Sequence, residues 1–332
     1  MNPNALPAPP ALFVTLLGAT FVLHLAALGL LVAAIWTRFG AEWSEAGSYA
    51  IEPIHRAGIV GFSMVITLGV PPLLFVQVLY GKYFYGSSIG IGYPWLAIVG
   101  YLMIGFYSLY LSRWCWDRHN GPSAGGKLFL ILTVASMILI GWTYSWNHLR
   151  SLSTTPWECS VTAAQVMSRL TGYLGAILTA SAACRVWFGR GWRTAVPIQT
   201  GAAIAFIAGG VLALYWAMTS AHATGSWGWA GRLLQLAGAL VSIGAGVIGL
   251  VNRGMLLRLL ALLSGFAVLS GMSLQRESYR LLAIGIEYDP ALRPVDPQWS
   301  PLAMFLLAVV IGIGVLAWLL RLVRQAQSQS TL

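Results

Sequence analysis

Long apolar segments separated by short polar connections run along almost the whole of this 332-residue chain. The hydrocarbon core of a bilayer is about 30 Å thick, and an α-helix of about 20 apolar residues crosses it. Because backbone polar groups within a bilayer must be satisfied inside their own segment, runs of this length predict membrane-spanning helices. We expect nine of them, at 11–37, 54–80, 92–113, 126–148, 163–188, 195–220, 229–251, 254–273 and 300–323.

The composition leads to the same fold class. The chain is 58% hydrophobic and only 8% charged, whereas a soluble domain has about 25% charged residues. Because these few charged groups cannot cover a globular surface, most of the surface is expected to face lipid. We therefore expect an all-α polytopic membrane protein with a single membrane domain over 1–332. Residues 11–148 and 163–273 would form two four-helix bundles, and 300–323 would add one helix.

The connections between the predicted helices indicate how the chain is oriented. With the N-terminus outside, twelve Lys and Arg residues fall on the inner face and six on the outer face. Because inner loops are enriched in Lys and Arg, this count predicts a periplasmic N-terminus and a cytoplasmic C-terminus in a bacterial inner membrane. The first ten residues contain no basic residue, so we do not expect a cleaved signal peptide. No basic cluster or stripe indicates nucleic-acid binding.

Ionisable residues inside predicted spans are rare in this chain. His24 lies near the middle of the first span, in FVLHLAAL, and Arg169 lies about two turns into the fifth. Such residues are costly in a bilayer and mark functional sites. His24 is interpreted either as a haem ligand or as a neutral core histidine bonded to a backbone carbonyl. No Asp or Glu falls deep in a predicted span, which argues against proton-coupled transport.

A group of cationic and imidazole side chains is expected at the outer ends of neighbouring predicted helices. A haem needs His or Met on its iron and is well served by arginines near its carboxylates. The predicted site therefore has His24, His148 and His222 as metal ligands and Arg150, Arg169 and Arg232 as propionate partners. The alternative interpretation of the outer group is a solvated rim in which Glu158 pairs with one arginine.

The stretch ITLGVPPLLFVQVLYGKYFYGSSIGIGYPWLAIVG, residues 66–100, combines features that are unusual for a membrane segment. Pro71 and Pro72 remove two backbone donors, which predicts a kink near the centre of the second helix. An aromatic, glycine-rich loop is expected after residue 80. Gln77, about one turn beyond the prolines, would line a quinone pocket if the kink shapes one, or serve only packing.

This stretch resembles the second and third helices of subunit I of cytochrome bd quinol oxidase. Leu68-Gly69-Val70 match the start of that family's pattern A-L-G-V-A-T-G, and Gln77 and Gly81 fall near its F-Q-F-G. Residues 93–100, YPWLAIVG, mirror its G-x-P-L-A-I-E-G, and His24 resembles its haem-ligating first-helix histidine. The resemblance extends to about residue 110 and implies a shared nine-helix scaffold that binds haem or quinone.

The chain also departs from the family at functional positions. Val99 stands where the family has a glutamate, and a second family glutamate corresponds to a position near Tyr107. A fifth-helix histidine ligand is replaced near Arg169, and the long quinol-binding loop shrinks to HATGSWGWAGR. The resemblance therefore does not imply oxygen reductase activity.

Three functions follow from these observations. The first is a subunit of a respiratory electron-transfer complex that binds haem b, quinone or both and exchanges electrons with an outer-face, cytochrome c-like partner. The second is a cofactor-free membrane anchor for extrinsic redox subunits, which the missing family residues favour. The third is a transporter or lipid-binding protein, which no binding motif supports.

Overall fold

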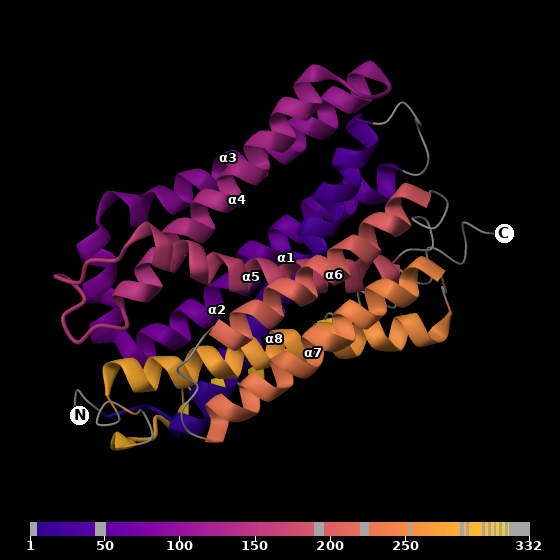
Figure 1. Cartoon of the computed structure of the whole chain (residues 1–332). Helices are drawn as coiled ribbons and strands as arrows, with labels where there is room; N and C mark the ends of the chain where they lie inside the picture. Colours follow the sequence, from indigo (N-terminus) through magenta and orange to yellow (C-terminus); the bar gives the residue numbers. More distant parts are fainter. Residues whose placement is uncertain are drawn as a thin grey trace. The chain divides into compact units, whose positions relative to one another are not determined.

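The structure, a computed structural model, describes residues 5–43, 51–188, 196–219, 226–251, 254–285, 289 and 292–300, with scattered positions beyond as far as Trp318. Eight α-helices lie in this described part, and they are labelled in Figure 1. They are α1 (Pro10–Trp43), α2 (Ile51–Ile91), α3 (Tyr93–His119), α4 (Ala124–Arg150), α5 (Ala163–Phe188), α6 (Val196–Thr219), α7 (Ser226–Val251) and α8 (Met255–Ile284). The predicted all-α fold is confirmed over these residues.

Seven of the eight helices are long and apolar enough to cross a membrane; α5 is the exception. Charged side chains of α5 lower its hydropathy, because Arg169 and Arg185 both lie within its 26 residues. Both of these arginines are buried against other helices, and α5 packs on α4, α6 and α8. The charges of α5 are thus enclosed by protein and withdrawn from lipid.

The chain divides into two compact units. Val14–Asp289 forms one unit, and Met1–Phe13 with Pro290–Leu332 forms the other. In the smaller unit, Leu6 pairs with the segment near Val295, where the Leu6 nitrogen donates to the Pro294 carbonyl at 2.9 Å. Both predicted halves, 11–148 and 163–273, fall almost entirely within the larger unit, and their division into two bundles stays a prediction.

The predicted ninth helix, 300–323, lies largely outside the described residues. Its described positions, the last of them Trp318, are helical. The predicted bounds of α5 agree with the structure at both ends, and those of α4, α6 and α7 agree to within three residues. The predicted ends of α1 and α3 fall six residues before the observed ends at Trp43 and His119, and those of α2 and α8 fall eleven residues before the observed ends.

The break in α2 lies at Tyr80, where φ is −132° and ψ is 32°, eight residues beyond Pro72. The kink at the proline pair stays a prediction, whereas the predicted loop after residue 80 is wrong, because the chain is helical as far as Ile91. Packing explains the difference, because Tyr80, Tyr83 and Phe84 are all buried. The helix ends at Gly92, whose φ of 66° favours glycine.

The end of α8 was predicted at residue 273 but lies at Ile284. Arg276, Glu277 and Arg280 were therefore expected in an outer loop, and instead belong to the helix. Arg276 and Arg280 continue the face of α8 that carries Leu269 and Met272, since these positions are three or four residues apart. Burial of that face extends the helix beyond its apolar part.

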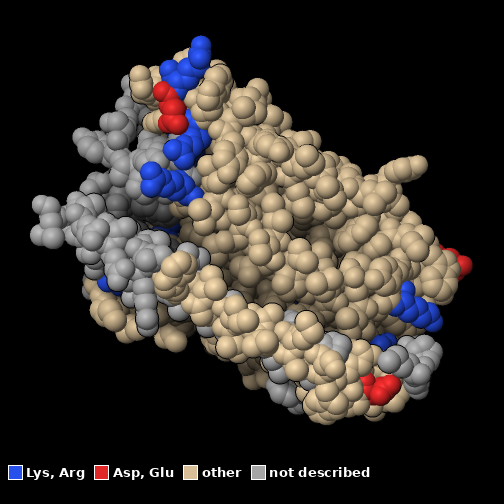
Figure 2. Space-filling view, turned by 180° about the vertical axis from the view of Figure 1, so that it is seen from behind, with Lys and Arg blue, Asp and Glu red and all other residues tan. Residues whose placement is uncertain are grey.

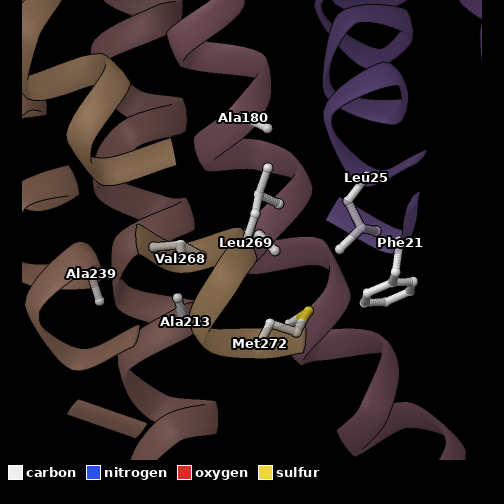
Figure 3. Close-up of a cluster of buried hydrophobic side chains, with 9 residues drawn as sticks. Phe21, Leu25, Ala180, Ala213, Ala239, Val268, Leu269 and Met272 are labelled. Atoms are coloured by element: carbon white, nitrogen blue, oxygen red, sulfur yellow. The ribbon is translucent and has the colours of Figure 1, made fainter. Parts of the chain in front are cut away.

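The largest part of the core lies where α1, α5, α6, α7 and α8 meet. Figure 3 shows this cluster, in which Phe21 and Leu25 of α1 face Leu269 and Met272 of α8. Small residues bring the helices close, since a Cβ atom on Gly175 would lie 2.7 Å from the backbone nitrogen of Ala213. Close approach through small residues is typical of helix packing in membranes.

The charged side chains are unevenly distributed over the surface. On the face shown in Figure 2, described Lys, Arg, Asp and Glu side chains gather in separate groups with a broad uncharged surface between them. Large apolar side chains are exposed along single helices, such as Leu96, Val99 and Met103 on α3. Exposed apolar surface of this extent fits a helix that faces lipid.

Candidate functional site

A group of buried cationic side chains lies between α4, α5 and α8. His148 lies near the end of α4, Arg169 lies in α5, and Arg276 and Arg280 lie in α8; all four are buried. Glu277 of α8 forms ion pairs with Arg276 and Arg280. We refer to these five residues as the arginine cluster.

His148 is held between two guanidinium groups of this cluster. Arg169 Nη2 contacts His148 Nε2, and Arg280 Nη2 lies 3.4 Å from His148 Nδ1. An arginine can only donate a hydrogen bond, so His148 Nε2 accepts from Arg169 with its lone pair. The ring also stacks on Tyr144 at an interplanar angle of 7°. Ligation of iron by His148 would therefore require Arg169 to leave Nε2.

Arg280 is the best-compensated cation of the arginine cluster. Its Nη1 donates to both carboxylate oxygens of Glu277, at 2.7 and 3.0 Å. Its guanidinium also lies over the ring of Tyr80, 4.6 Å from the centroid, and that residue is the point where α2 breaks. The break in α2 thus sets an aromatic face beneath a buried charge.

Arg276 is the least compensated cation of the arginine cluster. The residue is only 1% exposed, and none of its three side-chain nitrogens has a hydrogen-bond partner. Its Nε lies 3.5 Å from Glu277 Oε1 without forming a hydrogen bond, and its guanidinium lies 4.0 Å from the centroid of the Phe21 ring. Arg276 and Arg280 therefore share one carboxylate. Burial of an unpaired ion costs several kcal/mol, so this arrangement calls for a further negative group.

His24 lies in α1, one turn beyond Phe21, and its ring packs against α2. His24 Nδ1 lies 3.0 Å from the carbonyl oxygen of Val65. Since a carbonyl only accepts, Nδ1 carries the proton and Nε2 keeps a lone pair. A Cβ atom on Gly69 would lie 2.9 Å from His24 Cε1, so only glycine leaves room for the ring. The predicted alternative of a bond to a backbone carbonyl is confirmed, and it leaves the other nitrogen able to bind a metal.

Three further predicted site residues that the structure describes, Arg150, Arg232 and Gln77, have other partners than the arginine cluster. Arg150 donates to the carbonyls of Pro156 and Trp157, at 3.1 and 2.7 Å, and so closes the turn after α4. Arg232 donates to the carbonyl of Met218 at 3.3 Å. The two other predicted residues are Gln77, whose Oε1 accepts from Tyr85 at 3.1 Å, and His222, which lies outside the described residues.

A second buried arginine site lies between α1, α3 and the start of α4. Arg38 donates to Glu42 at 2.5 Å and lies over the ring of Trp116 at 4.0 Å. Glu42 also accepts from the backbone nitrogen of Ser123 at 3.0 Å. Arg38 and Glu42 carry one positive and one negative charge, so this site is balanced within the chain.

Sequence reasoning missed Arg276, Arg280 and Glu277 as site residues because the charged run QRESYR was assigned to a loop. The signal that could have found them is the helical spacing of Leu269, Met272, Arg276 and Arg280, which continues one face of α8. An arginine pair on the buried face of a helix is more informative than one on an exposed face, because burial of charge must be compensated.

Comparisons with known proteins add no relative to this picture. No family model, no curated protein and no solved structure matches the chain. Among the described residues, no three His, Cys, Asp or Glu side chains come together as a metal-binding group.

Proposed function

We propose that the chain is an integral membrane subunit of a bacterial respiratory electron-transfer complex that binds a b-type haem through His24, a quinone, or both. It would exchange electrons with a cytochrome c-like partner at the outer face. The main observation in support is the hydrogen bond of His24. Its Nδ1 donates to the Val65 carbonyl, so Nε2 keeps its lone pair.

This seating supports a metal-binding role for two reasons. Metal-ligating histidines almost always donate their second ring N–H to a carboxylate, a backbone carbonyl or a water, which fixes the tautomer and the ring orientation. Gly69 belongs to Leu68-Gly69-Val70, part of the resemblance to the oxidase subunit, and it is Gly69 that makes room for the ring. His24 and Gly69, which both belong to that resemblance, are therefore in contact.

A cation near His24 also supports haem binding. Phe21, one turn earlier on α1, carries the guanidinium of Arg276 over its ring, so a cation lies close to the proposed ligand. A bound haem would supply one-electron transfer, and the chain would supply ligation, orientation and a low-dielectric setting. For a quinone, Gln77 is the candidate contact, on the exposed side of α2 beside Tyr85.

The test is the reduced-minus-oxidised spectrum of the purified protein with a pyridine haemochrome assay, on wild type, His24→Ala and His119→Ala. His119 is an exposed histidine at the end of α3 and serves as the matched control. We expect a b-type band in wild type and His119→Ala that is lost in His24→Ala. A band that survives in His24→Ala, or no band in folded wild type, would overturn haem binding at His24.

A cofactor-free anchor for redox subunits is the second candidate function. The observation in its favour is the occupation of His148 by Arg169, which removes a second predicted ligand from the site. A colourless protein that co-purifies with a cytochrome would support this function over haem binding.

A further inference from the structure

Among the described residues, the arginine cluster has more guanidinium groups than carboxylates. Arg169, Arg276 and Arg280 contribute three guanidinium groups, and Glu277 forms ion pairs with Arg276 and Arg280. The printed ion pairs of the described residues thus set one carboxylate against three guanidinium groups. We propose that Arg276, Arg169 and Arg280 form a binding site for an oxyanion group, a phosphate or a carboxylate, that carries up to two negative charges.

Several hydrogen-bond donors at this site are unused. The three side-chain nitrogens of Arg276, Nε of Arg169 and the hydroxyl of Tyr173 are buried without a hydrogen-bond partner. Phe21 links them, because its ring lies under Arg276 and contacts the Tyr173 ring edge-on at 6.2 Å. The guanidinium of Arg169 lies 5.6 Å from the centre of the same tyrosine ring. The unused donors of α5 and α8 thus lie around the edge-on pair of Phe21 and Tyr173.

The other members of the cluster have positioning roles. Glu277 fixes Arg280 through two hydrogen bonds, and His148 separates Arg169 from Arg280. This leaves Arg276 as the group with the most free donors, and charge-assisted bonds from arginine to phosphate or carboxylate are among the strongest hydrogen bonds. The inference rests on this cluster and not on His24, so it stands or falls separately from the electron-transfer role.

The same oxyanion chemistry is available from three sources, which the experiment separates. Wild type, Arg276→Gln and the control Arg118→Gln are purified in detergent. Arg118 is an exposed arginine that lies over Trp114, so its variant removes an equal charge from the surface. Thermal unfolding is measured with inorganic phosphate, with sodium chloride at equal ionic strength, and in nanodiscs of phosphatidylcholine with or without phosphatidic acid.

We expect the unfolding midpoint of wild type and Arg118→Gln to rise by about 2–4 °C with the ligand in excess over its Kd. Arg276→Gln should not respond. A response to phosphate identifies a soluble anion, and a response only to phosphatidic acid identifies a lipid headgroup. Haem lost from Arg276→Gln but retained by Arg118→Gln identifies the carboxylates of a cofactor.

Bound phosphorus per protein is measured on wild type by itself, so the inference remains testable if Arg276→Gln fails to fold. Arg276→Lys, which keeps the charge, should restore part of the response. The proposal is overturned if wild type responds to none of the probes and carries neither bound phosphorus nor haem. It is also overturned if Arg276→Gln responds as strongly as wild type.

Discussion

Two buried arginines, Arg38 and Arg276, have different surroundings within the same compact unit of the chain. Both are almost fully enclosed, at 4% and 1% exposure. Arg38 has Glu42 one turn away on the same helix, and that carboxylate also accepts from the backbone before α4. Arg276 shares Glu277 with Arg280 and has an aromatic ring in place of a hydrogen-bond acceptor.

The difference separates a structural site from a binding site. A balanced pair fixes helices in place, and its opposite charges meet when the chain folds, although Arg38 Nη1 is buried without a hydrogen-bond partner. An unbalanced group is destabilising until a further negative group arrives, so it favours binding over stability. The position of Arg276 beside Phe21, one turn from His24, places the unbalanced group next to the proposed haem ligand.

The largest expected effect comes from breaking the balanced site. Glu42→Gln leaves Arg38 buried without its counter-charge, and removal of one partner of a buried pair costs about 3–5 kcal/mol. Thermal unfolding in detergent measures the loss. Glu158→Gln is the control, because it removes an exposed carboxylate in the turn after α4 and should change stability by about 0.5 kcal/mol or less. Equal losses in both variants would contradict a structural role for the Arg38 site.

An intermediate loss of stability is expected when the contact between α2 and His24 is altered. In Gly69→Ala the new methyl group would lie 2.9 Å from His24 Cε1, and overpacking of this kind costs about 1–3 kcal/mol. The displaced ring should also alter any haem spectrum. Gly100→Ala is the control, since no atom lies within 4 Å of its Cβ position. An unchanged spectrum and stability in Gly69→Ala would mean that α2 does not position His24.

A smaller effect is expected from the aromatic face beneath Arg280. Tyr80→Leu removes a ring whose centroid lies 4.6 Å from that guanidinium, and a desolvated cation–π contact is worth about 2 kcal/mol. Trp114→Leu removes the corresponding ring beneath the exposed Arg118, where about 0.5–1 kcal/mol is expected. Unfolding of the two variants under one condition measures the difference. A larger loss in Trp114→Leu would show that burial does not strengthen the contact.

The sequence predicted the helices well where apolar residues dominate and poorly where packing outweighs composition. The bounds of α6 and α7 were predicted to within three residues, because both helices are apolar over most of their length. The end of α2 was missed because its glycines and serines favour a loop in isolation, while Tyr83 and Phe84 are buried and maintain the helix. Local propensity is a weak prior that tertiary contacts override.

The candidate site was predicted only in part for a similar reason. His24, His148 and Arg169 stand out because they interrupt apolar sequence. Arg276 and Arg280 lie in a charged run, so their burial could not be inferred from composition and follows only from the face of α8 on which they lie. Arg150 and Arg232 were assigned to the same site as His148 and Arg169 because all were expected near the outer ends of helices. Instead, each donates to backbone carbonyls.

The most direct test of the difference between Arg38 and Arg276 is to neutralise each arginine and measure whether the protein becomes more or less stable. Arg38→Gln and Arg276→Gln are unfolded side by side in one detergent, without phosphate or added lipid. We predict that Arg38→Gln loses about 3–5 kcal/mol, because Glu42 is left unpaired. Arg276→Gln should be at least as stable as wild type, because an uncompensated buried charge is removed. A loss in Arg276→Gln as large as in Arg38→Gln would contradict the account.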